Sequence, residues 1–482
     1  MTRQHIIKSG LIAAVVLCAA WMPISRAHDG DPEDRLDQVD QNTQRDFDRE
    51  QQRDADDLIM DRSDQPDGAE TDAEDRTKNT VDFDERDKDD EGEAVDTVGD
   101  DADDDDNLGD GEDGEDGDER QDTARGLYGS SEAMRDLAEN ENPDEDERGF
   151  PVRRGEVVAL DLSDAGLASA QARGFVVIER TPLASLGSIV TRLSAPKNMD
   201  APTALTEMRR LDASGNYDLT HYYATEFIAQ GTRTAAALNA KLAATKGMLK
   251  VGMIDTGVAA HTVLKNTQIK QRDFSNAKAT TTTEHGTAIA SLLARDGANQ
   301  IYAANIFQGN GAKPYTSADA IVRALDWIVG QDVVVINISL AGPRNKILDA
   351  LIARALEKGH VIVAAAGNGG PTAPPAYPAA LPNVIAVTAV DHNLRVYRYA
   401  NQGRYITVSA HGVGVTAAAP GGGTGSYTGT SFAAPHIATW MARCTKTVST
   451  AIRQKCMTAL AKSAQDLGAP GKDEVYGLGY IQ

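Results

Sequence analysis

Five near-continuous apolar runs between residues 251 and 390 constrain the fold of this chain most strongly. Several are rich in Val and Ile, as is typical of strands buried on both faces of a parallel sheet. Helical patterns separate the runs, and this alternation predicts a doubly wound, mostly parallel α/β sheet. In such sheets, ligands bind beyond the carboxyl ends of the strands. The predicted strands are Val251–Ile254, Gln300–Phe307, Asp332–Leu340, His360–Ala366 and Asn383–Val390, and the predicted helices are His285–Ala294, Ser317–Val329 and Lys346–Lys358.

A second pattern of strands and helices precedes this domain, in residues 151–223. Its order is strand, helix, strand, strand, helix, strand, which predicts a small ferredoxin-like α+β unit. Ser163 stands where a residue that caps the first helix would lie. The predicted strands are Glu156–Leu162, Phe175–Glu179, Gly187–Leu193 and Asn216–Tyr223, and the helices are Asp164–Arg173 and Ala201–Leu211.

The charge of the chain is unevenly distributed. Residues 28–150 carry 50 Asp and Glu against 13 Lys and Arg, a net charge of −37, whereas residues 151–482 carry 22 acidic and 32 basic residues, a net charge of +10. Few apolar groups and strong self-repulsion predict that residues 28–150 are disordered. Since no window in this segment has the ligand spacing of an EF-hand, we expect diffuse cation binding there rather than a formed calcium site.

Residues 1–27 resemble a secretory signal peptide. Arg3 and Lys8 precede the apolar run Leu11–Trp21, and Ser25 and Ala27 are small residues at the positions that a signal peptidase reads. The pattern predicts a secreted or periplasmic protein, with an uncleaved membrane anchor as the alternative. No other segment of the sequence is expected to span a membrane.

Two cysteines follow the signal segment, Cys444 and Cys456, with 11 residues between them. An exported protein can hold a disulfide. Sequence alone does not fix the geometry that a disulfide requires. A bond between the two residues and two separately buried thiols are therefore both open.

Four polar residues lie at predicted strand ends or helix starts: Asp255, His285, Asn368 and Ser431. A serine hydroxyl is a weak nucleophile until a neighbouring histidine takes its proton, and the histidine needs a carboxylate that fixes its tautomer. Asp255, His285 and Ser431 are therefore predicted to form a catalytic triad. The Ser431 backbone N–H and the Asn368 side chain would bind the oxyanion. Pro435 is expected in the first turn of the last helix, where its missing N–H is tolerated.

The motifs around these residues follow one another in a recognisable order. They are Asp-Thr-Gly at 255–257, His-Gly-Thr at 285–287, Ala-Ala-Ala-Gly-Asn at 364–368 and Gly-Thr-Ser-Phe-Ala-Ala-Pro-His at 429–436. This order resembles the subtilisin family of serine endopeptidases over roughly residues 224–482. The resemblance implies hydrolysis of extended peptides through an acyl-enzyme intermediate, with no cofactor needed for the chemistry. It also implies a fold that Ca²⁺ stabilises.

Two departures from the family pattern bear on metal binding and on the triad. The segment Leu293–Gln300 is short beside members whose loop there wraps Ca²⁺, so structural calcium is an expectation without identifiable ligands. We claim no metal ligand. Ala288 stands where many members have a second histidine after the His-Gly-Thr motif. This difference should not affect the triad.

The resemblance also implies which residues line the substrate cleft. Ala376 is expected at the base of the primary specificity pocket, which would be apolar and uncharged. Such a pocket favours medium-sized apolar or aromatic side chains. The residues expected to bind substrate are Ser339, Leu340, Ala341, Gly342, Ala365, Ala366 and Gly367.

Residues 151–223 resemble the prodomain of this family, an intramolecular chaperone and inhibitor, in position and element order. An unrelated accessory domain is the alternative. If the strand Asn216–Tyr223 lies in the cleft, we expect self-cleavage between Tyr223 and Ala224, which leaves residues 224–482 as the peptidase domain. We expect a monomer whose partners are protein or peptide substrates and its own prodomain, and no nucleic acid.

Two other functions fit parts of the pattern. Asp-Thr-Gly is also the signature of aspartic proteases, but these use two such carboxylates and the chain has a single triplet. The other alternative is a catalytically silent protease scaffold that binds partners and carries the acidic tail. Such scaffolds usually lose a triad residue or the oxyanion asparagine, whereas this sequence keeps all four, which favours an active endopeptidase.

Overall fold

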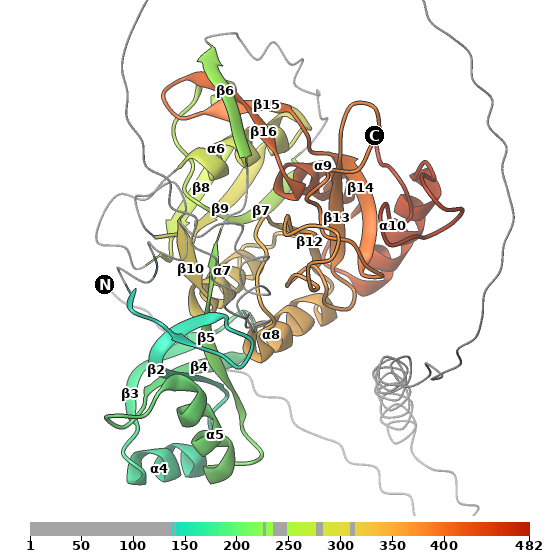
Figure 1. Ribbon diagram of the computed structural model, residues 1–482. Coiled ribbons are helices and arrows are strands. Elements are labelled where there is room, and N and C mark those ends of the chain that lie inside the picture. The colour runs from blue at the N-terminus through green and yellow to red at the C-terminus, as the bar shows by residue number, and fades with distance from the viewer. Residues whose placement is uncertain (1–136, 138–140, 225–227, 235–247, 276–282, 309–313) are drawn as a thin grey trace, which may run out of the picture. The chain divides into compact units, whose positions relative to one another are not determined.

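The computed structural model describes residues 137, 141–224, 228–234, 248–275, 283–308 and 314–482 (Figure 1). These residues all belong to one compact unit of the chain. The predicted signal peptide and residues 28–136 of the predicted acidic segment lie outside them. Among the helices that the structure describes, none is long and apolar enough to cross a membrane.

A seven-stranded parallel sheet forms the centre of the larger domain, in the order β14-β13-β12-β11-β7-β9-β8. The first of these strands in the sequence, β7, pairs with β9 on one side and with β11 on the other, so the strand order reverses there. The bounds are β7 Lys250–Asp255, β8 Gln268–Asp273, β9 Gln300–Asn305, β11 Val335–Ile338, β12 Val361–Ala365, β13 Ile385–Val390 and β14 Ile406–His411, with a 3₁₀ turn at Thr262–Leu264.

Helices cover both faces of this sheet. Helix α6 (Glu284–Arg295) packs with α9 (Thr430–Cys444), and α7 (Ala318–Val329) packs with α8 (Lys346–Glu357). Successive residues of a strand point to opposite faces, so Ile336 lies in the core under α7 and α8, and Val335 lies in the core under α6 and α9. Burial on both faces explains the continuous apolar runs and confirms the predicted parallel α/β sheet.

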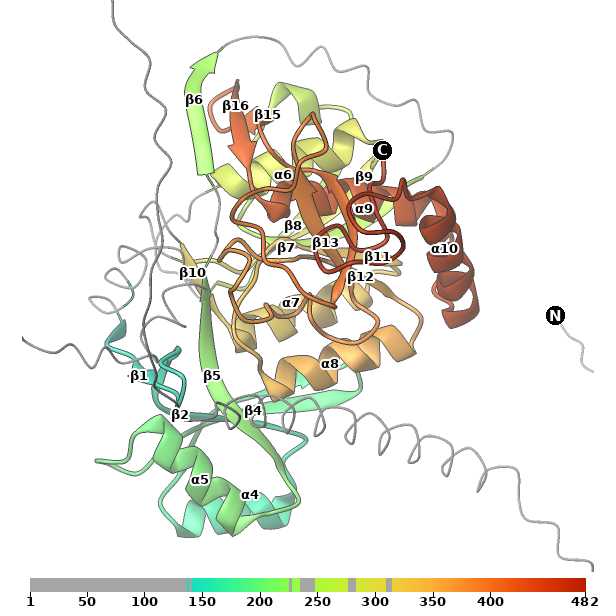
Figure 2. The ribbon, with the colours of Figure 1, turned by 45° about the vertical axis from the view of Figure 1, so that its right-hand side comes forward.

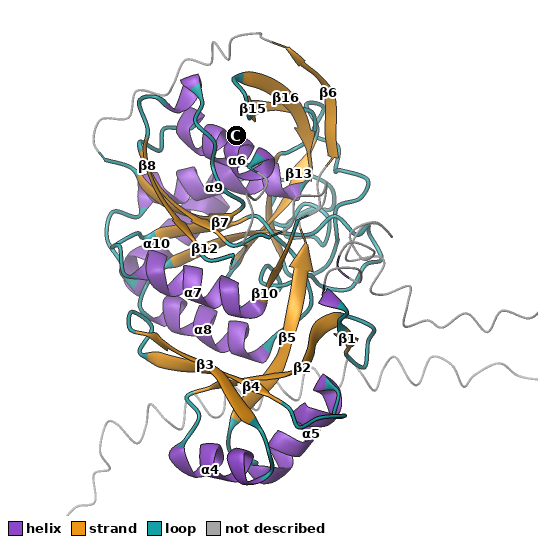
Figure 3. Cartoon of the chain, turned by 90° about the vertical axis from the view of Figure 1, so that its left-hand side faces the viewer, coloured by secondary structure: helices purple, strands orange, loops and turns teal. Residues whose placement is uncertain are grey.

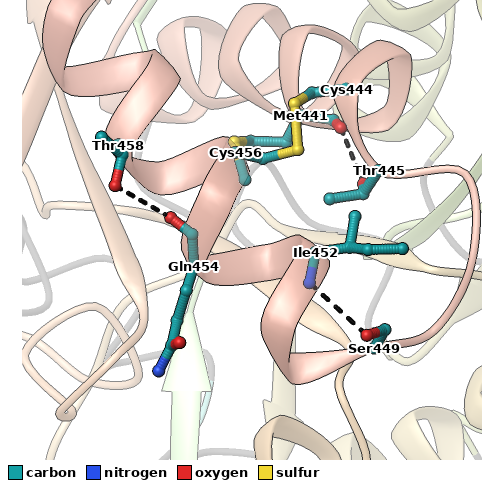
Figure 4. Close-up of a disulfide and its surroundings, with 8 residues drawn as sticks. All are labelled: Met441, Cys444, Thr445, Ser449, Ile452, Gln454, Cys456 and Thr458. Carbon is teal, nitrogen blue, oxygen red and sulfur yellow. Dashed lines mark hydrogen bonds between the residues drawn. A yellow bond between two sulfur atoms is a disulfide. The ribbon is translucent and has the colours of Figure 1, made fainter.

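A disulfide joins α9 to the last helix, α10 (Thr450–Ser463), and decides the question that the sequence left open. Cys444, the last residue of α9, is bonded to Cys456 in α10 (Figure 4). Cys456 itself is buried in the core on this side of the sheet. The two residues are therefore a cystine and not separate thiols.

The edge strand β8 was not predicted from the sequence. Its segment, Gln268–Asp273, is mostly polar, and its side chains are largely exposed. An edge strand whose side chains face water has no apolar run, so hydrophobic periodicity cannot reveal it.

The smaller domain is an antiparallel sheet with the central order β5-β2-β4-β3 and with helices α4 and α5 on one face. The order of its strands and helices along the chain is the predicted one. The Ser163 hydroxyl accepts the backbone N–H of Gly166 at 3.0 Å and so caps α4, as predicted. The bounds are β2 Pro151–Leu160, α4 Asp164–Ala172, β3 Val176–Leu183, β4 Ser188–Ser194, α5 Ala201–Leu211 and β5 Asn216–Ala224.

The prediction of disorder up to residue 150 is wrong at its end. Strand β1 (Asp144–Glu145) pairs with β2, and the turn between them is closed by Asp146, whose carboxylate accepts the N–H groups of Arg148 and Phe150 at 2.9 Å. Phe150 is buried. The average composition of the long acidic segment hides these few structured residues.

The other face of the antiparallel sheet contacts the larger domain. Helices α7 and α8 lie against strands β2, β3 and β5 (Figure 3). Strand β5 also continues the pairing into the larger domain, because its end pairs antiparallel with β10 (Tyr315–Ser317). The next segment of the chain, β6 (Ile228–Thr234), pairs with β16 (Gly423–Thr428), which pairs with β15 (Val415–Ala419) (Figure 2).

Candidate active site

Asp255 and His285 form a buried pair at the carboxyl end of β7. His285 Nδ1 lies 2.7 Å from Asp255 Oδ1, and the two residues are 1% and 0% exposed. The backbone N–H of Thr256 donates to the same carboxylate oxygen at 2.6 Å. A carboxylate at this distance makes Nδ1 the protonated nitrogen, so Nε2 carries the lone pair of the neutral ring. The arrangement can therefore accept a proton at Nε2.

Gly286 explains why the two motifs meet. A Cβ at this position would lie 2.3 Å from the carbonyl oxygen of Thr256 and 2.6 Å from that of Gly257. The Gly286 N–H instead donates to Thr256 Oγ1 at 2.7 Å. Glycine thus allows the start of α6 to approach the end of β7 closely enough for His285 to reach Asp255.

Ser431 is the second residue of α9 and is 3% exposed. Its hydroxyl donates to the carbonyl oxygen of Ser339 at 3.3 Å. The ring of the next residue, Phe432, packs against the imidazole of His285, with 5.2 Å between the ring centroids. The start of α9 is therefore held between the segment after β11 and the Asp255–His285 pair.

Pro435 corrects one detail of the prediction. Because α9 begins at Thr430, Pro435 lies in its second turn and not in its first. A proline has no N–H, so the carbonyl of Ser431 has no helical donor four residues on. The Ser339 hydroxyl donates to that carbonyl at 3.1 Å and itself accepts from Asn337 Nδ2 at 2.7 Å. The Ser339 hydroxyl thus takes the place of the missing helical donor and ties the Ser431 backbone to the segment after β11.

Asn368 lies just after β12, and its amide has a fixed orientation. The amide oxygen accepts the backbone N–H of Thr430 at 2.9 Å and the Thr430 hydroxyl at 3.1 Å. A backbone N–H can only donate, so the atom that faces Thr430 must be the oxygen. The amide nitrogen is consequently on the side away from Thr430 and is the donor end of the group.

The predicted substrate-binding residues are buried in two neighbouring segments. The first follows β11 and the second lies at the end of its parallel neighbour, β12. Gly342 exchanges two backbone hydrogen bonds with Tyr377, at 3.0 and 2.9 Å, and Ala376 shares a buried cluster with Ala341. The structure therefore places Ala376 beside the segment after β11, and its position at the base of the primary pocket stays a prediction. The seven buried residues are Ser339, Leu340, Ala341, Gly342, Ala365, Ala366 and Gly367.

The larger domain is similar to known proteins. The profile of the subtilase family matches residues 246–479. Subtilisin DY from Bacillus licheniformis is 33% identical over 250 residues, an alignment that covers 48% of this chain and 88% of that protein. The chain belongs to the subtilase family. It is a subtilisin-like serine endopeptidase.

Two further relatives match a smaller share of their own length. Minor extracellular protease Epr from Bacillus subtilis (strain 168) is 28% identical over 245 residues, which cover 48% of this subtilase and 38% of that protein. The crystal structure of fervidolysin from Fervidobacterium pennivorans, a keratinolytic enzyme related to subtilisin, superposes with a TM-score of 0.58 at 19% identity and covers 70% of this chain and 61% of that one. At this identity, the likeness to fervidolysin shows the fold alone.

The end of β5, a strand of the smaller domain, lies between two segments of the larger domain. Ala224, at the end of β5, pairs with Tyr315 of β10 on one side and with Ala341 on the other. Tyr223 is 0% exposed, and its hydroxyl donates to the carbonyl oxygen of Pro343 at 3.1 Å. Its ring lies on Gly342, where a Cβ would be 2.2 Å from the ring. The sequence did not reveal β10 as a pairing partner of β5, because a three-residue strand has no periodicity to detect.

The connection between α6 and β9 is the segment that is short beside family members whose loop there wraps Ca²⁺, and two of its polar side chains are engaged within the protein. Asp296 is bonded to His436, and the Asn299 side-chain oxygen accepts the N–H of Leu249 at 2.9 Å. Within the part of the chain that the structure describes, no group of three or more His, Cys, Asp or Glu side chains could hold a metal. We assign no metal ligand.

Proposed function

We propose that Ser431 is the nucleophile of this endopeptidase, that His285 is its general base and that Asp255 orients the imidazole. The buried 2.7 Å contact between His285 and Asp255, beside the start of α9, carries this proposal. Ser431 Oγ attacks the carbonyl carbon of the scissile bond while its proton moves to His285 Nε2. The same proton then passes to the leaving amine, which departs, and water hydrolyses the acyl-enzyme by the reverse sequence of proton transfers.

The oxyanion of each tetrahedral intermediate needs donors that are already in place. We assign this role to the Asn368 amide nitrogen and to the backbone N–H of Ser431. The contacts with Thr430 hold the asparagine amide in one orientation, and Ser431 lies in the first turn of α9, where the helix dipole favours negative charge. The donors need no rearrangement when charge develops.

The substrate is proposed to be an extended peptide that lies antiparallel between β10 and the segment after Ser339. The enzyme's own strand β5 supports this, because its end is paired on both sides in this position. The primary pocket, with Ala376 at its base, has no charged wall residue among those assigned to it. It should favour a medium-sized apolar or aromatic side chain.

Residues 151–224 are proposed to be an inhibitory prodomain. Besides the strand in the cleft, the Asp218 carboxylate accepts the N–H of Lys346 at 2.6 Å and so satisfies a donor at the start of α8. In the reverse direction, the carboxylate of Asp326 in α7 accepts the N–H groups of Ser185 and Leu186 at 2.8 and 2.9 Å. Two helices of the peptidase thus bind two separate parts of the smaller domain.

The register of β5 moves the proposed cleavage point away from the bond between Tyr223 and Ala224. Ala224 faces Ala341, whereas Ser431 contacts Ser339, two residues earlier in the sequence. Since the strands are antiparallel, the chain must run beyond Ala224 to reach the nucleophile. On the other side, β6 begins at Ile228, opposite Thr428. We place the cut between Ala224 and Ile228, an interval whose inner residues lie outside the described part of the chain.

We also propose that the enzyme is exported, with residues 1–27 as a cleaved signal peptide, and that it acts as a monomer. This proposal rests on the charge and apolar pattern of the first residues, which lie outside the described structure. A relative that is named an extracellular protease is consistent with it.

The N-termini of the purified wild-type chain and of its Ser431→Ala variant test these roles together. The wild type should hydrolyse an extended peptide and yield a fragment that begins after residue 224. The Ser431→Ala variant should stay uncut and inactive. Hydrolysis by the variant would refute the assigned nucleophile, and a mature N-terminus upstream of residue 200 would refute the prodomain.

A further inference from the structure

The chain segment just before the proposed prodomain, residues 141–150, touches both walls of the cleft, and we call it the acidic arm. We propose that the acidic arm is a second inhibitory element, which binds the rim of the cleft and clamps strand β5 in place. The inference rests on the proposed inhibitory role of the prodomain. It adds a binding surface, formed by β10 and Gln308 of the peptidase, that binds a carboxylate of the acidic arm.

One side of the clamp is a single carboxylate, that of Glu141. Its Oε1 atom accepts the Tyr315 hydroxyl at 2.8 Å and Gln308 Nε2 at 3.3 Å, and its Oε2 atom accepts the Tyr222 hydroxyl at 3.1 Å. Tyr315 and Gln308 belong to the peptidase, whereas Tyr222 belongs to β5. The carboxylate therefore ties the strand in the cleft to the wall with which that strand pairs.

The tyrosine hydroxyls remain donors across the working pH range. Burial, and next the Glu141 carboxylate, raise the pKa of the Tyr315 hydroxyl, so it stays protonated. Hydrogen bonds to an ionised acceptor are stronger than those between neutral groups. Leu137 is buried in a cluster with Tyr222 and Tyr315, which shields these bonds from water.

The other side of the clamp is apolar. Phe150, at the end of the arm, is 2% exposed and forms a buried cluster with Ala224, Ala341 and Ala376. Ala224 is the last residue of β5, and the other two alanines belong to the opposite wall of the cleft. The arm therefore contacts β5 and a wall of the peptidase at both of its ends.

Asp146 holds the arm in the shape that both ends require. Its carboxylate closes the turn before Phe150 and lies 3.3 Å from Nε2 of His221 in β5. A turn that is already formed loses little conformational entropy when it binds. After the cut, β5 would be a product strand held by backbone pairing, and the arm adds side-chain contacts that slow its departure.

Amide hydrogen exchange of the full-length chain tests the clamp without any need for catalysis. In the Ser431→Ala background, Glu141→Ala should speed exchange in β10 and at the end of β5 by roughly ten- to a hundredfold, the loss expected for hydrogen bonds to a charged group. Glu147→Ala is the matched control, because Glu147 is an exposed residue of the same arm and the same charge is removed. Exchange in α4 and α5 should stay unchanged in both. Equal exchange rates in the two variants would overturn the proposal.

A double-mutant comparison in the active chain separates the contact from a general loosening of the prodomain. Glu141→Ala and Tyr315→Phe should each shorten the lag before peptide hydrolysis appears. The double variant should have the same lag as the single variant with the shorter lag, because both changes remove the same contact. Fully additive effects would mean that the two residues do not act through one contact and would contradict the clamp. A chain that never hydrolyses peptide would sink the proposed function, while the exchange result on the uncut chain would still decide the clamp.

Discussion

The two sheets of this subtilase are buried in different ways. Both faces of the parallel sheet are covered by helices of its own domain, and the two cores between them consist of aliphatic and aromatic residues. The antiparallel sheet has an apolar core under α4 and α5. Its other face, against α7 and α8, adds charged contacts to apolar ones, among them Arg153 Nη1 at 3.4 Å from the buried Asp319 carboxylate. The first arrangement suits a permanent fold, and the second suits the release that we propose for residues 151–224, which we therefore call the releasable region.

If the parallel sheet supplies the chemistry, the largest loss of turnover in this comparison should come from a change at the carboxyl ends of its strands, where Asp255 lies. Asp255→Asn should reduce turnover by roughly 10⁴-fold, because an amide in place of the carboxylate favours the wrong histidine tautomer. Asp273→Asn, at the end of the edge strand β8, is the control and should leave turnover within a few-fold. Steady-state kinetics on an extended peptide measures both. An Asp255→Asn enzyme with near-normal turnover would contradict the assignment.

Asn368→Ala changes a residue just after β12, at the same ends of the parallel strands, and should reduce turnover less. Removal of one oxyanion-hole donor costs about 10² to 10³ in turnover, a figure that was established on a subtilisin, a relative of this chain. The loss should appear in kcat with KM little changed, since the donor acts mainly on the transition state. A rise in KM at constant kcat would show that Asn368 binds substrate instead.

The disulfide should stabilise the permanent part and leave the releasable part alone. Replacement of both Cys444 and Cys456 by Ser opens a loop with a sequence separation of 12 and should lower the free energy of unfolding by about 3 kcal/mol. Turnover at 25 °C should not change, because Cys444 lies at the opposite end of α9 from Ser431, roughly 20 Å away along the helix axis. Denaturant unfolding and a peptide assay report the two quantities. A faster release of the proposed prodomain in this variant would contradict the expectation that the disulfide stabilises the peptidase domain alone.

The smallest of these effects is a pH dependence at the releasable interface. Burial alone would raise the pKa of the Asp319 carboxyl, but the charges of Arg153, Arg192 and Arg323 outweigh burial and lower it. Its contribution to the stability of the uncut chain is therefore present above the unfolded-state pKa and is lost as the pH falls through the folded-state value. Unfolding of the Ser431→Ala chain at neutral and acid pH should show this loss, and Asp319→Asn should reduce it. Asp164→Asn, at an exposed residue of α4 outside the interface, should not.

The sequence revealed the elements within each region better than the contacts between the two regions. Buried strands such as β11 and β12 have continuous apolar runs, and the motifs around Asp255, His285 and Ser431 are short and contiguous. Residue type and order were therefore enough to name the parallel sheet and the candidate site. The edge strand β8 was missed because its side chains face water, and periodicity reports burial rather than pairing.

The contacts between the two regions depend on registers that a sequence does not contain. The pairing of Ala224 with Ala341 shifts the proposed cleavage point, and nothing in the local sequence distinguishes this register from one shifted by a residue or two. The three donors to Glu141 come from three separate segments, and the link from Ser339 to the Ser431 carbonyl depends on where α9 begins. Such contacts follow from tertiary packing, so they became visible only in the structure.

Covalent labelling shows whether Ser431 is the nucleophile that the Asp255–His285 pair activates. The wild-type chain, after self-processing, is treated with a fluorophosphonate, and its intact mass and peptide map are recorded. We expect one adduct per peptidase domain, on Ser431, and none in the Ser431→Ala variant or after labelling in denaturant. An adduct on another residue, or equal labelling of the Ser431→Ala variant, would contradict this assignment.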